Sequence, residues 1–451
     1  MLTRRPKIMT SARTEVTPGG GRLRQGKRWA AAALAVGSIV GMTGCGAAEE
    51  GTPTLTWYIN PDDGGQAELA QQCTAAANGK YRIQVSLLPN EAASQREQLA
   101  RRLAAGDSSM DIMSLDPPFI PELAEPGFLA PVPEGTAERT TKNTLEGALA
   151  GAKWKDKLVT VPFWANTQLL WYRKSVVEKA GLDMSKPVTW DQLIDVARTQ
   201  EKFLGVQGSR AESMTVWINA LVESSGGHIV ENPDAPADEI SIGIDSEAGK
   251  KAAEIVGTIG REGLGSPGLP TQAENASMLL FQGDEGSFMV NWPFVWPATN
   301  SAIKDGSLPA DLADDIGWTT YPRTDASQES RPPLGGINLG VGSSSKHPDL
   351  AYEAIECIVS PEHQTQYFVT NGNPPSDSTS YDAAEVKEKF PMAPTIRESL
   401  EQAAPRPQTP YYNEVSTSIQ QFWAPASDVN ADTPKNNTEF IVQVLRGERL
   451  L

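Results

Sequence analysis

Strand and helix patterns alternate along the chain from Thr54, and this rhythm restricts the fold more than any other feature of the sequence. In chain order the patterns predict a strand at 54–59, a helix at 65–77, a strand at 81–88, a helix at 94–105, a strand at 110–115 and a short helix at 119–124. Strands that alternate with helices of this length indicate βαβ units and a mainly parallel sheet. The chain therefore belongs to the α/β class.

Polar loops follow the three predicted strands, at residues 60–64, 89–91 and 116–118. Parallel sheets bind ligands at the carboxyl ends of their strands, so Asn60, Asp62 and Asp116 are candidate ligand-binding residues. Ordinary turn chemistry explains the same residue types, because Asn, Asp, Pro and Gly dominate turns. Both interpretations stay open on the sequence alone.

The middle of the chain, from about 171 to 277, is mostly helical by pattern, and Thr189 is placed to cap a helix over 190–197. A span rich in Gly and Pro, residues 260–270, predicts an exposed loop. The length that remains after the first 44 residues is enough for two domain-sized cores.

The first 44 residues have the pattern of an export signal rather than of a folded domain. They carry eight basic residues and one acidic residue, followed by an apolar run from Trp29 to Met42 that is too short to span a bilayer. The run ends in Met-Thr-Gly-Cys45, which resembles the lipobox of bacterial lipoproteins and predicts a lipid anchor on Cys45. The alternative is an ordinary signal peptide with a chance cysteine.

The formal net charge of −17 argues against nucleic acid and against anionic membrane surfaces as partners. Two further cysteines, Cys73 and Cys357, could pair in an oxidising compartment or remain buried free thiols. Only three histidines occur, without any paired spacing, so neither a metal site, a cofactor nor a His-based triad is indicated.

Several segments resemble the carbohydrate-binding members of the solute-binding proteins of bacterial ABC importers. They are Val159–Pro162 with Asn166–Tyr172, Phe281–Glu285 with Val290–Pro293, and Leu334–Asn338 with a helix over 347–359. Other stretches are similar to the trehalose-recycling lipoproteins of mycobacteria; these are residues 95–103, 111–116, 166–172, 291–295, 335–339, 390–392 and 404–407. Cys73 and Cys357 fall on cysteine positions of that group, which favours the disulfide.

The resemblance implies a two-lobed, periplasmic-binding-protein-like (type II) fold, with each lobe a mainly parallel sheet flanked by helices and the ligand cleft at the hinge. The signal peptide would be 1–44, the first lobe 45–165 plus 312–364, and the second lobe 166–311 plus 365–451. The function implied is capture of a disaccharide, trehalose first, and its delivery to the permease subunits of an ABC importer. The protein would be an extracytoplasmic monomer held to the membrane by the lipid on Cys45.

A sugar site needs side chains that bridge pairs of hydroxyl groups and an aromatic face that covers C–H patches. The resemblance assigns Asp116 and Asn166 to the polar role, and Trp292, beside Asn291, is the expected ring platform. Further candidates, each with a purely structural alternative, are Glu274 at a helix start, Gly335 and Gly336 in a turn or bulge, and Arg406 in an exposed-looking stretch.

Sugar capture requires no bond chemistry, so an enzyme is not expected. Maltose, sucrose or a malto-oligosaccharide are alternative ligands. A secreted glycoside hydrolase is the alternative of a different class, since it would need only two suitably spaced carboxylates. A lipid-anchored binder of peptides or metal is a third interpretation, although the low histidine count disfavours metal.

Overall fold

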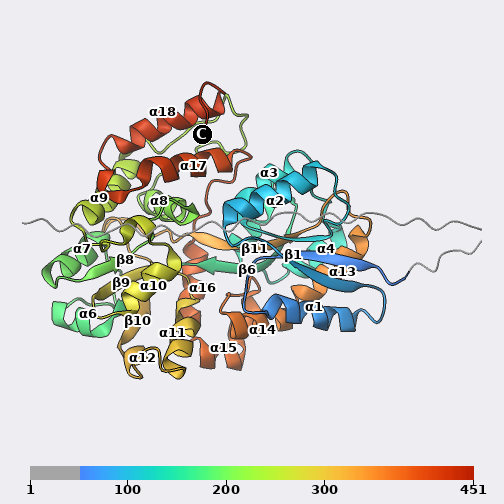
Figure 1. The fold of residues 1–451 in the computed structure, drawn as a ribbon, viewed down its shortest axis with the longest axis horizontal. Helices are drawn as coiled ribbons and strands as arrows, with labels where there is room; N and C mark the ends of the chain where they lie inside the picture. The colour runs from blue at the N-terminus through green and yellow to red at the C-terminus, as the bar shows by residue number, and fades with distance from the viewer. Residues whose placement is uncertain (1–50) are drawn as a thin grey trace, which may run out of the picture. The chain divides into compact units, whose positions relative to one another are not determined.

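A computed structural model describes residues 51–451, which form one compact unit. The expected signal peptide and Cys45 lie outside the described residues. Within them, two sheets organise the fold: a five-stranded sheet of order β2-β1-β3-β11-β6 and a four-stranded sheet of order β10-β7-β9-β8 (Figure 1). None of the helices in this part of the chain has the length and apolarity that a membrane crossing requires.

The first lobe is built around the five-stranded sheet. Its elements are β1 (Thr54–Ile59), α1 (Gly65–Ala76), β2 (Arg82–Leu87), α2 (Ala92–Ala104), β3 (Ile112–Leu115), the 3₁₀ turn η1 (Pro117–Phe119), α3 (Ile120–Ala124), α4 (Glu134–Thr141), α5 (Glu146–Ala150), the hairpin β4 (Lys153–Trp154) and β5 (Lys157–Leu158), β6 (Val161–Thr167), β11 (Leu334–Gly340), α13 (Pro348–Ile358) and α14 (Pro361–Asn371). The six elements predicted from 54 to 124 are all present, with ends that differ by no more than two residues.

The second lobe is built around the four-stranded sheet. Its elements are β7 (Leu169–Arg173), α6 (Lys174–Ala180), α7 (Trp190–Thr199), β8 (Phe203–Gly205), α8 (Glu212–Ser224), α9 (Glu247–Arg261), η2 (Leu269–Thr271), α10 (Glu274–Gln282), β9 (Gly286–Asn291), α11 (Val295–Lys304), α12 (Leu312–Asp315), β10 (Ile316–Thr319), α17 (Tyr412–Trp423), η4 (Ala426–Asp428) and α18 (Thr433–Leu445). Thr189 caps α7 through a capping box with Gln192, as its sequence predicts.

Alternation of side chains buries both faces of the first sheet. Leu55, Trp57 and Ile59 of β1 pack on the α1 and α13 side, whereas Tyr58 packs with α2 and α3 on the other face. Figure 1 shows α1 on one side of β1 and the pair α2 and α3 on the other. The period of two that identified β1 in the sequence therefore also determines which helices cover which face.

Both sheets are mainly parallel, as expected, and each contains one strand that runs in the opposite direction. β1 pairs in parallel with β2 and β3, but β11 is antiparallel to both of its neighbours. In the second sheet β8 and β9 are parallel, whereas β7 is antiparallel to β9 and β10. The reversed strands are β11 and β7, whereas β6 runs in the same direction as β1 to β3. β7 and β11 are each the first strand after the chain passes from one sheet to the other, so they can enter a sheet in the opposite direction.

The chain crosses between the lobes at other residues than expected. β6 belongs to the first sheet as far as Thr167, and β7 begins two residues later, so the first crossing is at Gln168 rather than after Ala165. β10 pairs with β7, so the return to the first lobe comes at Leu334 rather than at Leu312. α14 continues past residue 364 to Asn371 and contacts α1 of the first lobe.

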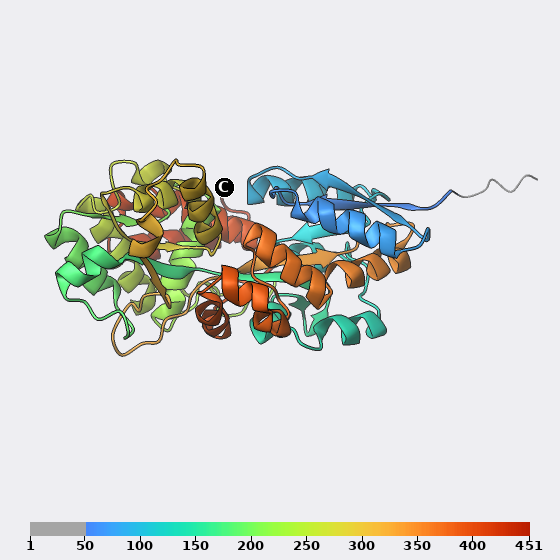
Figure 2. The same cartoon turned by 90° about the horizontal axis from the view of Figure 1, so that it is seen from below.

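The helices after β11 join the two halves. α15 (Ala384–Lys389) and α16 (Ala393–Gln402), preceded by the short turn η3 (Ser378–Asp382), bury Val386, Ile396 and Leu400 in a core shared by both lobes. That core includes Ala165 of β6 and Trp171 of β7. Figure 2 shows these orange helices running between the two halves, so this segment, expected in the second lobe, lies at the joint.

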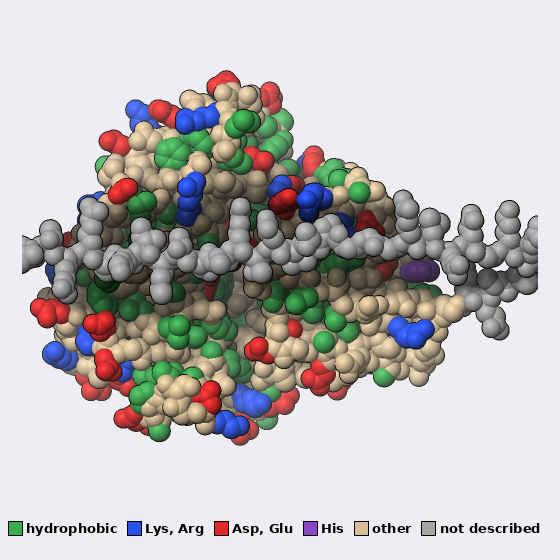
Figure 3. All heavy atoms as spheres, in the orientation of Figure 1, with side chains coloured by type: hydrophobic (Ala, Val, Ile, Leu, Met, Phe, Trp, Pro, Cys, Tyr) green, Lys and Arg blue, Asp and Glu red, His purple; other side chains and the backbone are tan. Residues whose placement is uncertain are grey.

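Charged side chains are interspersed over the face shown in Figure 3. Acidic and basic groups alternate there with uncharged ones on the part of the surface that is coloured. The strong negative charge of the chain is therefore spread across this part of the face rather than gathered in one patch.

Candidate functional site

A cleft of about 900 Å³ opens between the two sheets. The first lobe contributes the loops after β1, β2 and β3, and the second lobe contributes the starts of α8 and α10 and the segment after β9. Eight of the ten candidate ligand-binding residues line the cleft: Asn60, Asp116, Asn166, Glu274, Trp292, Gly335, Gly336 and Arg406. The strand-end rule thus placed the three loops of the first lobe at one cavity.

Asp62 does not line the cleft. Its carboxylate accepts hydrogen bonds from the backbone N–H groups of Gly64 and Gln66, at 3.0 and 2.8 Å, and from the Tyr367 hydroxyl at 3.2 Å. An acidic side chain is stabilised at a helix start, where backbone donors lack partners. Asp62 therefore holds the start of α1 and connects it to α14.

Asn291 is fully buried and lies behind the cleft rather than in it. Its side-chain nitrogen donates to the Glu274 carbonyl oxygen at 2.9 Å and to Ser277 Oγ at 3.1 Å. Its Oδ1 accepts from the backbone N–H of Trp292 at 2.9 Å. Asn291 thereby fixes two cleft residues, Glu274 and Trp292, relative to each other.

Arg406 is buried, with 4% of its side chain exposed, in contrast to the exposed stretch its sequence suggested. Its two terminal nitrogens each donate to a carboxylate at 2.6 Å, Nη2 to Asp116 and Nη1 to Glu212. Because Asp116 follows β3 of the first lobe and Glu212 begins α8 of the second, the guanidinium group bridges the lobes. This arrangement is called the ion triad below.

The second lobe holds Glu212 firmly. The hydroxyl groups of Tyr412 and Ser416, both on α17, donate to its two carboxylate oxygens. Burial by itself would lower the pKa of Arg406, but the carboxylates of Asp116 and Glu212 raise that pKa well above its ordinary value. Arg406 is therefore a permanent cation whose charge is already taken up by two protein carboxylates.

Trp292 and the two glycines meet at the floor of the cleft. A Cβ atom on Gly335 would lie 3.0 Å from the Trp292 indole, so the absent side chain leaves room for the ring. Gly336 has a φ of +122°, and a Cβ there would come within 2.2 Å of the Trp164 carbonyl oxygen. Glycine is required at Gly336 on both grounds.

Glu274, at the start of α10, and Asn166, in β6, also line the cleft. Burial raises the pKa of the Glu274 carboxyl above its ordinary value, although a hydrogen bond from the Trp292 side chain opposes the shift. Asn166 is half-buried, and its Oδ1 accepts from the backbone N–H of Thr167 at 3.0 Å. The amide nitrogen of Asn166 has no hydrogen bond to the described residues and can donate to a ligand.

Several lining atoms are buried without a hydrogen-bond partner in residues 51–451. They are Asn60 Oδ1, Ser209 Oγ, Ser213 Oγ and Arg406 Nε. Buried polar atoms in folded proteins are almost always paired with protein, water or ligand. The cleft therefore presents polar atoms that a ligand rich in hydroxyl groups can satisfy.

The sequence did not single out Glu212, Ser209 or Ser213, although all three line the cleft. They follow β8, a three-residue strand inside a region whose pattern is mostly helical. Had Phe203–Gly205 been identified as a strand, the same strand-end rule would have indicated the polar segment after it.

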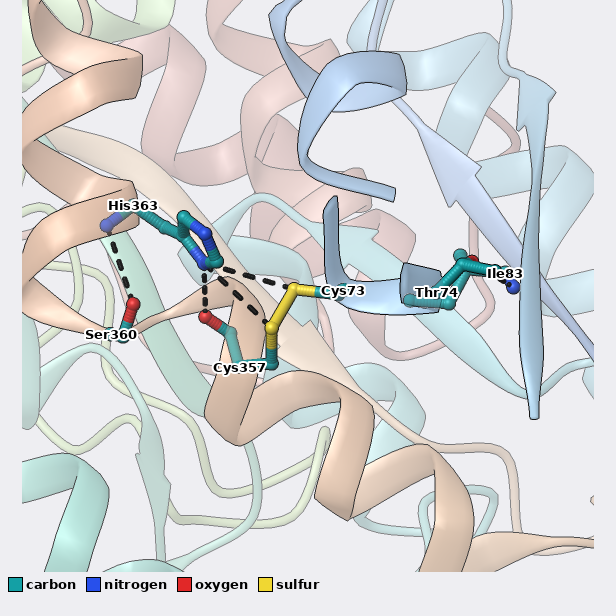
Figure 4. The surroundings of a disulfide bond; sticks show 6 residues. All are labelled: Cys73, Thr74, Ile83, Cys357, Ser360 and His363. Atoms are coloured by element: carbon teal, nitrogen blue, oxygen red, sulfur yellow. Dashed lines mark hydrogen bonds between the residues drawn. A yellow bond between two sulfur atoms is a disulfide. The ribbon is translucent and has the colours of Figure 1, made fainter. Parts of the chain in front are cut away.

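Cys73 of α1 and Cys357 of α13 form a disulfide, as the sequence favoured (Figure 4). His363 lies beside it, and its Nδ1 donates to the Cys357 carbonyl oxygen at 2.7 Å. These three side chains are the only His, Cys, Asp and Glu group in residues 51–451 with spacing suited to a metal ion. Because the two sulfur atoms are bonded to each other, they are not free thiolate ligands.

Comparison with known proteins gives one matching family and several relatives. The profile described as "Bacterial extracellular solute-binding protein" matches residues 64–365. A "Probable ABC transporter-binding protein" of Deinococcus radiodurans is 26% identical over 58% of this chain, and the match spans 62% of that protein's length. A "Mannitol-binding protein" of Pseudomonas aeruginosa is 24% identical over 74% of this chain and 77% of that protein.

Among solved structures, maltose-bound MalE3 of T. maritima superposes with a TM-score of 0.73 at 22% sequence identity. The superposition covers 88% of this chain and 100% of the MalE3 chain. At this level of identity the superposition shows the fold alone. It confirms the two-lobed architecture that the sequence predicted.

Proposed function

The chain belongs to the bacterial extracellular solute-binding protein family, and we propose that it captures a sugar in its interlobe cleft and delivers it to the permease of an ABC importer. The observation that carries the proposal is the cleft itself. An indole ring, Trp292, stands among unpaired polar atoms contributed by both lobes. A sugar offers a ring face to the indole and hydroxyl groups to the polar atoms.

A disaccharide fits the size of the cleft, because about 900 Å³ lies in the upper part of the range for small-molecule sites. We favour trehalose because the sequence resembles LpqY, the mycobacterial lipoprotein that recycles it. The relatives named for mannitol and maltose keep other polyols and glucosides as alternatives.

The proposal includes export and anchoring. Residues 1–44 would be removed as a signal peptide, and the lipid on Cys45 would hold a monomer near the permease subunits outside the cytoplasm. A residue that carries two or three acyl chains anchors firmly, whereas one chain gives only weak, reversible attachment. Mass spectrometry of the native protein should find the lipid on Cys45, and an unmodified or uncleaved N-terminus would contradict this part.

Isothermal calorimetry of the purified protein against trehalose, maltose, sucrose and mannitol tests the central claim. Replacing Trp292 with alanine should weaken binding of the best ligand about tenfold or more, because the ring platform is lost. The matched control is Trp296→Ala, in the first turn of α11, where the indole donates to the Lys389 carbonyl oxygen and does not line the cleft. Equal affinities of the two variants would show that the site is misplaced.

The same samples separate binding from hydrolysis. A glycoside hydrolase would release glucose from trehalose or maltose on incubation, whereas a binding protein would return the disaccharide intact. Absence of heat with every sugar in the panel would contradict the proposed function.

A further inference from the structure

The charge of the cleft is unbalanced. Four carboxylates line it, on Glu91, Asp116, Glu212 and Glu274, and Arg406 is the single basic side chain among its lining residues. Arg406 donates hydrogen bonds to both Asp116 and Glu212, so its positive charge is paired with these two carboxylates. Glu91 and Glu274 therefore line the cleft without a second basic side chain among the described lining residues to neutralise them.

These two carboxylates come from opposite lobes. Glu91 precedes α2 in the first lobe and is exposed at the rim, whereas Glu274 begins α10 in the second lobe and is half-buried. Both carboxyl groups line the same cleft, one from each side of it. Burial raises the pKa of Glu274 above its ordinary value, and the negative charges of Glu91 and Glu212 add to that rise. Two like charges in one cleft favour a ligand that brings a positive charge.

The first lobe also offers more hydrogen-bond acceptors than donors to the cleft. This observation favours a ligand rich in donors, independently of the charge argument. The Asn60 side-chain nitrogen is used to donate to Gln95 Oε1 at 2.8 Å, which leaves Asn60 Oδ1 buried and unpaired. Gln95 in turn donates to the Pro89 carbonyl oxygen at 2.7 Å, which connects Asn60 to the loop that carries Glu91. This side of the cleft thus offers acceptors and needs donors.

Ser213 in the second lobe also points to a ligand. It is 5% exposed and lines the cleft, and its hydroxyl group has no partner in the described residues. A deeply buried, unpaired hydroxyl is satisfied most simply by a bound molecule or an ordered water.

We infer that the ligand is an amino-substituted sugar whose ammonium group lies between Glu91 and Glu274. An ammonium group supplies three donors and one positive charge, whereas a hydroxyl group supplies one donor and no charge. A sugar phosphate or a uronic acid is excluded, because its negative charge would meet two uncompensated carboxylates. The inference rests on the proposed function and names the ligand class for the same cleft.

Calorimetry of the full chain tests this with matched probes. We would compare trehalose and maltose with their derivatives that carry an amine at C2 or C6, and with the corresponding 6-carboxylates. At about 0.1 M salt the better amine should bind about tenfold tighter than its neutral parent, and at about 1 M salt the difference should shrink through screening. The carboxylates should bind more weakly than either.

Charge-neutral variants locate the effect. Glu91→Gln and Glu274→Gln should each bring the ratio of the neutral sugar's Kd to the amine's Kd close to one. Glu97→Gln is the matched control. Glu97 lies in α2, the helix that Glu91 precedes; its side chain is 62% exposed and does not line the cleft. In this variant the ratio should stay near ten.

The outcomes separate the two proposals. If a neutral sugar binds as tightly as every amine at low salt, the inference is overturned and the sugar-binding function stands. If the amine is preferred but Glu97→Gln abolishes the preference as strongly as Glu274→Gln does, the assigned position is overturned. If neither parents nor amines bind, the proposed function itself fails.

Discussion

At the scale of single residues, the shape of the cleft depends on two glycines, Gly335 and Gly336. Gly335 lies against the Trp292 ring, and Gly336 places β11 close to the Trp164 backbone. The strand pairing of β11 with β6 is irregular just after these residues, between Ile337 and Asn338. Gly335 therefore shapes the floor of the cleft through its missing side chain, and Gly336 does so through its backbone conformation.

Replacing Gly336 with alanine should lower the free energy of unfolding by about 3 kcal/mol, because the new Cβ meets a backbone carbonyl and the residue keeps a positive φ. The control is Gly263→Ala, whose φ is +70° but whose Cβ would meet nothing within 4 Å. There only the backbone conformation is penalised, at about 1–2 kcal/mol. Urea unfolding of both variants measures the difference, and equal losses would contradict the steric argument.

Arg406 shows what could be predicted at this scale and what could not. The family resemblance assigned it to the cleft, which it lines. Its burial and its two carboxylate partners were not predictable, because Glu212 and Asp116 are 194 and 290 residues away in sequence. An ion triad assembled by tertiary contacts leaves no local pattern.

At the scale of elements, helix ends connect the secondary structure of the second lobe. Asp315, the last residue of α12, accepts hydrogen bonds from Arg173 Nε at 2.6 Å, the Ser175 backbone N–H at 2.7 Å and Ser175 Oγ at 2.9 Å. These contacts attach α12 and β10 to the end of β7 and the start of α6. Partial burial works to raise the pKa of Asp315, but the hydrogen bonds from Ser175 and Arg173 lower it below its ordinary value.

Asp315→Asn should lower the free energy of unfolding by about 1–2 kcal/mol at neutral pH, through the loss of charge-assisted hydrogen bonds. Since the folded pKa is depressed, the carboxylate stabilises the fold above its unfolded pKa of about 4 and ceases to do so as the pH falls through the lower, folded value. The gap between wild type and variant should therefore be constant above about pH 5 and close below about pH 4. Asp314→Asn, at the exposed neighbouring residue, is the control and should leave the free energy of unfolding at neutral pH nearly unchanged.

A clear hydrophobic period in an element decided whether the sequence could predict it. Strands β1 to β3 and helices α1, α2 and α13 were predictable because each has a clear hydrophobic period and a turn or cap signal at its ends. β8 and β10, of three and four residues, are too short to show a period. Since β10 was not recognised as a partner of β7, the return to the first lobe was expected too early.

At the scale of the whole molecule, one hydrophobic core is shared by the two sheets, and one disulfide lies within the first lobe. The shared core holds residues of β6, β7, α16 and the start of β11, so each lobe buries part of its apolar surface against segments that serve both. The disulfide lies within the first lobe, where it ties α1 to α13 across 284 residues of sequence. Which lobe a segment joins is decided by these long-range contacts, and the sequence indicated it only where the family resemblance was strong.

The double variant Cys73→Ala/Cys357→Ala should lower the free energy of unfolding by about 2–5 kcal/mol, because the cross-link restricts a very long loop in the unfolded chain. Thermal unfolding of wild type with and without dithiothreitol, beside the variant, measures the effect. The variant should not respond to the reductant. Equal stability of oxidised wild type and variant would show that the cross-link contributes nothing.

The disulfide also determines what a single proteolytic cut does to the protein outside the cell. A protease that cuts the backbone once, in any loop between Cys73 and Cys357, leaves two pieces that remain one molecule, because a bond outside the backbone still joins them. Such a nicked chain would run at full mass on a non-reducing gel and separate only after reduction. The long stretch that contains the whole second sheet can thus be broken once without being lost.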